Sequence, residues 1–374
     1  MIRTAHFVPK QYRCIMTDVA AQRHRIDWVD YAKGICIILV VMMHSTLGVE
    51  KATGQTGLLS NFIEWARPFR MPDFFLISGL FLTRRINTAW RSYLDTKVVH
   101  FAYFYILWMT IQFGFKGPGL VADDGFGAAL GQYALGYIDP FGTLWFIYLL
   151  AIFFVVTKAT KAAPPYLVFC LAALLEILPV NTGWLVIDEF AARYVYFFAG
   201  YWLAPMVFRA TEHVWSRNAL AVLAMLYIWA TAHSMAMISG FSELPGMGLV
   251  LGFAGCAAVI TTSVLLARSG RVEWLRYLGA NSIVVYLAFF LFMATTRSVG
   301  LKLIPSIHVD VLATLCTLAG VVGPILLFWA VRSTPLSMLF KRPGWAKLKA
   351  LETAREQGYT VAHDKLLIKQ PQAR

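Results

Sequence analysis

Charged residues are scarce in this chain. Asp, Glu, Lys and Arg make up 14% of the 374 residues, whereas a soluble globular domain carries roughly 25%. Hydrophobic residues make up 59%, and the mean hydropathy is +0.62. So few charges cannot wet the surface of a soluble globule of this size, and the same composition excludes disorder for most of the chain. Its apolar surface must therefore face lipid.

Cysteines are also few, and the common catalytic signatures are missing. Four of the five cysteines lie in apolar runs, and neither a CxxC motif nor a Cys/His pair with metal-ligand spacing occurs. We therefore predict no disulfide and no metal site. The sequence has no Walker A, GxSxG or HExxH pattern, which leaves ATP-driven transport, serine hydrolysis and zinc proteolysis without support.

Long apolar runs dominate what is present. A helix that crosses the bilayer core needs about 20 mostly apolar residues, and ten runs approach that length. We therefore predict an all-α, polytopic membrane protein with about ten transmembrane helices. The stretch 126–138 is shorter and rich in glycine, and we interpret it as a re-entrant or interfacial segment. The ten runs lie near residues 29–48, 70–84, 97–115, 142–158, 164–181, 190–208, 218–238, 246–267, 277–296 and 310–331.

The basic residues indicate an orientation. With a cytoplasmic N-terminus, 25 of the 33 Lys and Arg residues fall on the cytoplasmic side and six on the other, as the positive-inside rule requires. The net charge of +13 therefore indicates a lipid bilayer as partner rather than nucleic acid. We predict a cytoplasmic basic segment at 1–28, a transmembrane domain at 29–331 and a cytoplasmic basic tail at 332–374.

The first run carries the ionisable groups of greatest interest. Lys33 and His44 are eleven residues apart, which is three helical turns plus ~20°, so both lie on one stripe about 16 Å apart. Asp30 falls near the same face. A neutral imidazole can take a proton from a hydroxyl near pH 7, and a cation at the cytoplasmic mouth can hold phosphates. The alternative is structural: Lys33 snorkels toward Asp30, and His44 bonds another helix.

A second group of polar residues begins the next run. Arg70 and Asp73 are three residues apart at its predicted outer mouth, where they can pair or face an aqueous cavity. The following Ser78-Gly79 permits close helix approach. An interfacial ion pair beside a packing notch is the structural alternative.

Two further residues are candidates for the outer side. Arg193 begins the sixth run beside Asp188 and Glu189, and is either an anion clamp or an interfacial salt bridge. Trp145 opens the fourth run, where it can belong to the aromatic belt of the membrane interface or stack on a sugar ring.

Four segments together resemble a known family. They are Asp30-Tyr-Ala-Lys33-Gly through Val-Val-Met-Met-His44, Arg70-Met-Pro-Asp-Phe-Phe-Leu-Ile-Ser-Gly79, Leu144-Trp-Phe-Ile, and Leu278-Gly-Ala-Asn-Ser-Ile-Val-Val-Tyr286. In this order, over residues 25–331, they are similar to the acyltransferase-3 family of bacterial membrane proteins. The resemblance implies ten transmembrane helices in the bacterial inner membrane. It also implies acetyl-CoA or another acyl-CoA as co-substrate, with no bound cofactor, and O-acylation of an extracytoplasmic glycan or glycolipid.

The family's signature in its first helix is an arginine, ten residues and a histidine. His44 matches the histidine, and Lys33 stands in place of the arginine; lysine keeps the charge but lacks the planar fork. Tyr286-Leu-Ala-Phe289 lies where many members carry a histidine, so no role is transferred from that residue.

The resemblance and the residues together give a set of expected roles. We expect His44 to act as general base or transient acyl carrier, and Lys33 and Asp30 to contact the donor. The acceptor side is expected to involve Arg70, Asp73, Trp145 and Arg193. Two other functions use the same features: transport of a glycan or glycolipid, and a non-enzymatic role in envelope assembly.

Overall fold

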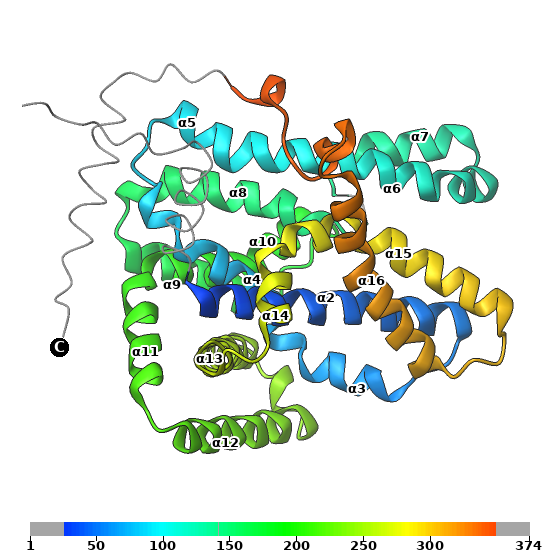
Figure 1. Ribbon diagram of the computed structural model, residues 1–374. Coiled ribbons are helices and arrows are strands. Elements are labelled where there is room, and N and C mark those ends of the chain that lie inside the picture. Colours follow the sequence, from blue (N-terminus) through cyan, green and yellow to red (C-terminus); the bar gives the residue numbers. More distant parts are fainter. Residues whose placement is uncertain (1–25, 141, 349–374) are drawn as a thin grey trace, which may run out of the picture.

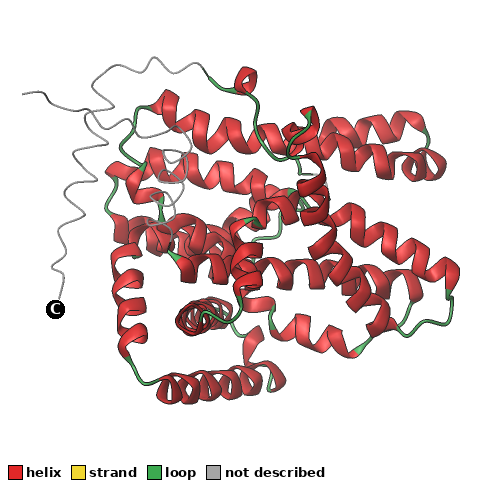
Figure 2. Ribbon diagram, viewed as in Figure 1, coloured by secondary structure: helices red, strands yellow, loops and turns green. Residues whose placement is uncertain are grey.

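The structure is a computed structural model that describes residues 26–140 and 142–348. Within these ranges it is helical and has no β-strand, as predicted (Figure 2). The predicted basic segment at 1–28, apart from its last three residues, and the tail beyond residue 348 lie outside the described residues.

One long helix lies at the centre of the molecule. α2 (Asp27–Thr53) runs across the middle of Figure 1 and makes its most extensive contacts with five other helices. Its first turn carries Asp27 and Asp30, which suit the positive end of the helix dipole. It stops at Gly54, where φ is 69°, a left-handed conformation that glycine adopts readily. The five partners are α4 (Arg67–Leu80), α13 (Met247–Ser269), α14 (Glu273–Ala280), α15 (Ser282–Leu303) and α16 (Val309–Val331).

The remaining helices surround this centre. α8, α10 and α12 run roughly along α2 in Figure 1, whereas α13 crosses them and is seen nearly end-on. A π-helical turn at Asp95–Val99 joins α5 to α6. The helices not yet given are α3 (Leu58–Trp65), α5 (Trp90–Leu94), α6 (His100–Asp124), α7 (Phe126–Leu135), α8 (Trp145–Ala159), α9 (Pro165–Ile177), α10 (Leu185–Trp202), α11 (Ala204–Ser216) and α12 (Ala219–Ile238). Short 3-10 turns lie at Leu82–Arg84, Thr160–Ala162, Phe241–Glu243, Pro335–Leu339 and Gly344–Ala346.

Among the described residues, seven helices are long and apolar enough to cross a membrane. Every one of the ten predicted runs is helical, but three do not meet both conditions. α4 has 14 residues and α9 has 13. α10 has 18 residues and carries Asp188, Glu189 and Arg193. The seven are Asp27–Thr53, Trp90–Asp124, Trp145–Ala162, Ala219–Ile238, Met247–Ser269, Ser282–Leu303 and Val309–Val331.

Two predicted runs have different boundaries in the structure. The sixth was expected to end near residue 208, but α10 stops at Trp202 and α11 turns away at the edge of the bundle (Figure 1). Pro205 in the first turn of α11 suits a new helix start. The ninth run is divided at Asn281, between α14 and α15. The glycine-rich stretch after α6 forms α7, which folds back along α6.

Glycines bring helices into close contact at two places. A Cβ on Gly79 of α4 would collide with the backbone oxygen of Phe197 in α10, and a Cβ on Gly200 would collide with that of Leu76. This confirms the packing role predicted for Ser78-Gly79. In the same way, Gly279 of α14 lies directly on the backbone oxygen of Asp30 in α2. These contacts fix how α4 and α14 sit against their neighbours.

We predict that Gly200→Ala destabilises the protein by about 1–3 kcal/mol, because an added methyl group must push two backbones apart. The matched control is Gly114→Ala in α6, where no atom lies within 4 Å of the new Cβ. Unfolding by SDS in mixed micelles, followed by tryptophan fluorescence, measures both. Equal stability of the two variants would contradict the close α4–α10 contact.

Candidate functional site

The ends of α2 give the site its two sides. We call the end of the bundle at Asp27 the inner end and the end at Thr53 the outer end, following the predicted orientation. Lys33 lies toward the inner end and His44 toward the outer end, and both side chains are half-buried. Val40 lies one turn before His44 on the same helix. Lys33 and His44, which helical spacing predicted to share one stripe, therefore lie on a single continuous helix.

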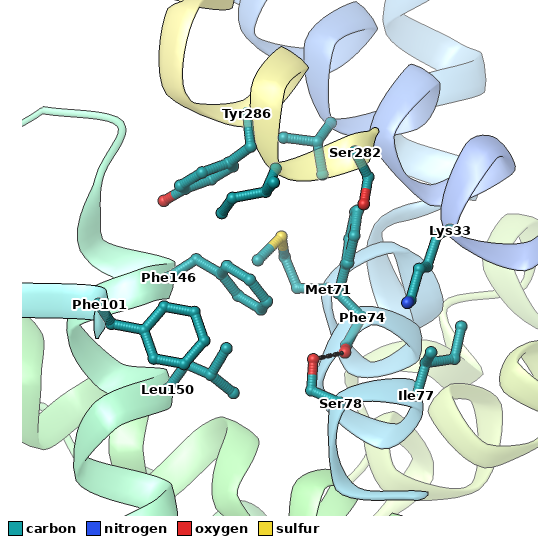
Figure 3. Close-up of a pocket in the computed structure, with 12 residues that line it drawn as sticks. Lys33, Met71, Phe74, Ile77, Ser78, Phe101, Phe146, Leu150, Ser282 and Tyr286 are labelled. Carbon is teal, nitrogen blue, oxygen red and sulfur yellow. Dashed lines mark hydrogen bonds between the residues drawn. The ribbon is translucent and has the colours of Figure 1, made fainter. Parts of the chain in front are cut away.

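A cavity begins at Lys33 and reaches the level of Val40. Its volume is about 190 Å³, and α2, α4, α6, α8 and α15 all contribute side chains to it. Figure 3 shows Phe101, Phe146 and Leu150 on one side and Lys33 with Ser78 on the other. The lining is mostly apolar, and Ser78 already donates its hydroxyl to the backbone oxygen of Phe74. The cavity therefore suits a flexible, weakly polar chain with an anionic group at the Lys33 end.

Other cations lie near Lys33. The charges of Lys33 and Arg85 both act electrostatically on Lys97. Lys97 belongs to the π-helical turn Asp95–Val99, a kind of irregularity that is frequent at functional sites. Its ammonium also lies 4.3 Å from the ring centre of Phe154. The sequence analysis did not single out Lys97 or Arg85, because neither lies near Lys33 in the chain.

The beginning of the predicted tail is fixed to this same turn. Arg342 donates to the backbone oxygen of Asp95 at 2.8 Å and to its carboxylate at 2.7 Å. The backbone N–H of Leu348 donates to the other carboxylate oxygen at 2.7 Å. Residues 342–348 thus hold the π-helical turn that carries Lys97.

His44 faces the outer half of the bundle. Its ring lies 5.3 Å, centre to centre, from the ring of Phe289 in α15. The charges of Arg70 and Lys116 act on it. In the described part of the chain, no hydrogen bond is made to its ring nitrogens, so the imidazole remains available for proton transfer.

Two of the predicted acceptor residues come together at this end. Arg193 is paired with Glu189 at 3.0 Å, and its charge acts on Arg70. Arg70 donates to the backbone oxygen of Ile63 at 2.9 Å. In the structure the charge of Arg70 therefore acts on His44, and the charge of Arg193 acts on Arg70. The separation of these residues in the sequence did not reveal either interaction.

Asp73 does not lie where the sequence placed it. We expected it at the outer mouth with Arg70, but it is fully buried and forms no ion pair with Arg70 among the described residues. Instead it accepts a hydrogen bond from the thiol of Cys36 at 3.0 Å. Three residues after Arg70 on α4, the side chain has turned into the packed contact with α2. This position corrects the prediction and removes Asp73 from the acceptor side.

Asp30 and Trp145 lie in packed parts of the bundle. Asp30 is buried where α14 crosses α2, so its position does not indicate donor contact. Just beside it, Arg276 of α14 donates to Glu273 at 2.6 Å and lies 3.6 Å from Asp27; the Glu273 carboxylate raises the pKa of Arg276. Trp145 is half-buried at the start of α8, 6.2 Å from the ring of Phe75.

A hydrogen-bonded group that the sequence analysis missed connects α6 and α15 to the turn before α8. The hydroxyl of Tyr286 donates to the backbone oxygen of Thr143 at 2.7 Å. The amide of Gln112 donates to the Thr143 hydroxyl at 3.1 Å. Next to them, Gly142 has a φ of 66°, which favours glycine. This polar group anchors the turn before α8.

Comparisons with known proteins agree with this geometry. A family model described as an acyltransferase domain matches residues 26–330. The chain is 26% identical over 250 residues to the inner membrane protein YcfT of Escherichia coli strain K12, which covers 60% of this chain and 69% of that protein. No solved structure matches the chain. Together with the apolar helices, these matches make the chain a multi-pass integral protein of the inner membrane.

We predict that cysteines placed at Arg67 and Asp73 differ in reactivity, because the Arg67 side chain is 51% exposed and Asp73 is buried. With Cys14 and Cys170 replaced by serine, Arg67→Cys should react with a membrane-impermeant maleimide on native protein. Asp73→Cys should react only after denaturation in SDS. Gel filtration checks that both variants are folded, and equal labelling of the two native variants would return Asp73 to the outer mouth.

Proposed function

Since the chain belongs to the acyltransferase-3 family, we propose that it transfers an acetyl group from cytoplasmic acetyl-CoA to a hydroxyl of an extracytoplasmic glycan or glycolipid. The observation that carries the proposal is the arrangement along α2: a mostly apolar cavity that begins at Lys33 leads to within one turn of the half-buried imidazole of His44. The two ends of that path have different chemistry, and each suits one substrate.

The inner end suits the donor. Lys33, Lys97 and Arg85 are close enough for their charges to interact, and phosphates of CoA are the anions that such a group can hold. The mostly apolar cavity above them suits the pantetheine arm. The lysine at position 33 lacks the planar fork of arginine, and the second lysine at position 97 supplies an additional donor for phosphate oxygens.

His44 acts as general base in this scheme. The imidazole takes the proton of the acceptor hydroxyl as its oxygen attacks the thioester carbonyl carbon. A new C–O bond forms, the C–S bond breaks, and the CoA thiolate leaves with the proton that His44 received. The products are the acyl ester and free CoA, so no other reactant is needed.

The scheme requires that α2 connects the two sides of the membrane. We propose ten crossings, in which α4, α9 and α10 complete the seven long apolar helices, with both termini in the cytoplasm. The short α4 and α9 cross only part of the bilayer core by themselves, and neighbouring turns extend them. Acetyl-CoA then reaches Lys33 from the cytoplasm, while the acceptor reaches His44 from outside.

We predict that His44→Ala lowers the rate of acyl transfer by about 10²–10⁴-fold, the usual contribution of a general base. The assay follows labelled acetyl from acetyl-CoA into the glycan and glycolipid fraction of inverted membrane vesicles. His308→Ala is the control, because that side chain is 71% exposed and remote from the cavity. Transfer at the wild-type rate by normally inserted His44→Ala would overturn the proposal, and substrate movement without acetylation would favour a transporter.

We predict that Lys33→Gln and Lys97→Gln each raise the KM for acetyl-CoA about tenfold, since each removes one charge-assisted contact to phosphate. The KM for S-acetylpantetheine, which has no phosphate, should stay the same. Lys161→Gln, an exposed cation of the inner end, is the control and should change neither value. An equal rise for both donors would contradict phosphate binding by these two lysines.

A further inference from the structure

Two cationic side chains, Arg70 and Lys116, act on His44 at the outer end, and two more, Arg193 and Arg297, act on those two cations. Arg70 comes from α4, Lys116 from α6, Arg193 from α10 and Arg297 from α15. The proposed donor does not use them, because its phosphates lie at the inner end. Their arrangement therefore calls for a separate explanation.

Lys116 reaches His44 through two neighbouring phenylalanines of α15. The His44 ring lies 5.3 Å from that of Phe289, and the Lys116 ammonium lies 4.4 Å from the ring centre of Phe290. On its other side, the Lys116 nitrogen would be 3.0 Å from a Cβ on Gly142. The turn held by Tyr286 and Thr143 thus leaves space for the ammonium beside the imidazole.

Arg297 approaches from the far end of α15. Its guanidinium lies directly on Gly48, where an added Cβ would collide with Nη1. Gly48 is one turn beyond His44 on α2, so the guanidinium lies about one helical turn from the position of His44. The charge of Arg297 acts on Lys116, so these two cations are close enough to interact electrostatically.

Arg70 completes the group from the opposite side. Its Nη1 donates to the backbone oxygen of Ile63, and its buried Nε has no hydrogen-bond partner among the described residues. A buried donor without a partner is energetically unfavourable. A bound acceptor atom would remove that cost.

Carboxylates form no ion pair with Arg70 or Arg297 among the described residues, although the charge of Glu64 acts on Arg70. Glu189 is paired with Arg193, and Glu64 lies 3.2 Å from Arg67. In the described part of the chain, no carboxylate oxygen lies within 4 Å of Arg70 or Arg297. Like charges inside the bundle repel one another. An anionic ligand bound among them would offset that repulsion.

We propose that the cations at the outer end select an anionic acceptor, a saccharide that carries a phosphate or carboxylate close to the hydroxyl that is acylated. This inference rests on the proposed function and specifies its acceptor. The anion lies between the guanidinium groups of Arg70 and Arg297 and the ammonium of Lys116. Guanidinium groups bind the oxygens of either anion in a forked geometry, and the bound charge places the neighbouring hydroxyl at His44.

The test measures binding to the full-length protein in nanodiscs of zwitterionic lipid, without any acyl donor. The probes are maltotriose, maltotriose 6-phosphate and maltotriose oxidised to one uronic acid, followed by tryptophan fluorescence. We expect the two anionic probes to bind at least about tenfold more tightly than the neutral one, as a single charge-assisted contact allows. Preference for one of the two identifies phosphate or carboxylate as the natural group.

Variants distinguish binding by Arg297 and Lys116 from a general effect of positive surface charge. Arg297→Gln and Lys116→Gln should each lose the preference for anionic probes, whereas Arg297→Lys should retain part of it. Lys302→Gln, an exposed cation on the same helix as Arg297, should leave the preference intact. Equal binding of neutral and anionic probes by the wild-type protein, or an equal loss in Lys302→Gln, would overturn the inference.

The result is independent of the proposed activity. Acetylation of a neutral acceptor at the same rate by wild-type protein and Arg297→Gln would refute the anionic acceptor and leave acyl transfer by His44 standing. Normal acetylation by His44→Ala would refute the proposed function itself, whatever the probes bind.

Discussion

The rigidity of α2 sets the distance on which the rest of the site depends. Eleven residues of one continuous helix separate Lys33 from His44, which corresponds to about 16 Å along the axis. Five helices pack around α2, and Gly279 lets α14 rest directly on its backbone. Because the helix is held along its whole length, the cationic inner end and the imidazole keep a fixed separation of about half the hydrocarbon core.

The two ends of this path differ in how they are built. At the inner end, the tail residue Arg342 holds the π-helical turn that carries Lys97. At the outer end, Arg70 and Lys116, from separate helices, act on His44, and Arg70 and Arg297 form no ion pair with a carboxylate in the described part of the chain. The cavity between Lys33 and Val40 is mostly apolar. A donor that is anionic at one end and reactive at the other matches this sequence of environments.

Sequence alone predicted the helical fold, the stripe of Lys33 and His44 and the packing notch at Gly79, because each depends on local spacing along one helix. It placed Asp73 wrongly, because a separation of three residues brings two side chains to one face only approximately. The hydrogen bond with Cys36 decided the outcome. The interaction of Lys97 with Lys33, and that of Arg297 with Gly48, join residues far apart in the chain and follow from tertiary packing alone.

The membrane boundaries were harder to predict for a related reason. Proline and polar residues end α10 at Trp202 and start α11, whereas the apolar run in the sequence continues past that point. The three charges of α10 also make it a poor span by composition. One of them, Arg193, acts on Arg70, whose charge acts on His44. The charge that makes α10 less apolar therefore lies near the candidate site.

The most direct test of this account is a cryo-electron microscopy structure with a non-hydrolysable thioether analogue of acetyl-CoA. The account predicts phosphate density at Lys33 and Lys97, the pantetheine arm in the cavity beside Val40, and the acetyl-like carbon next to the imidazole of His44. Density for the analogue away from α2, or with its phosphates at the outer end, would contradict it.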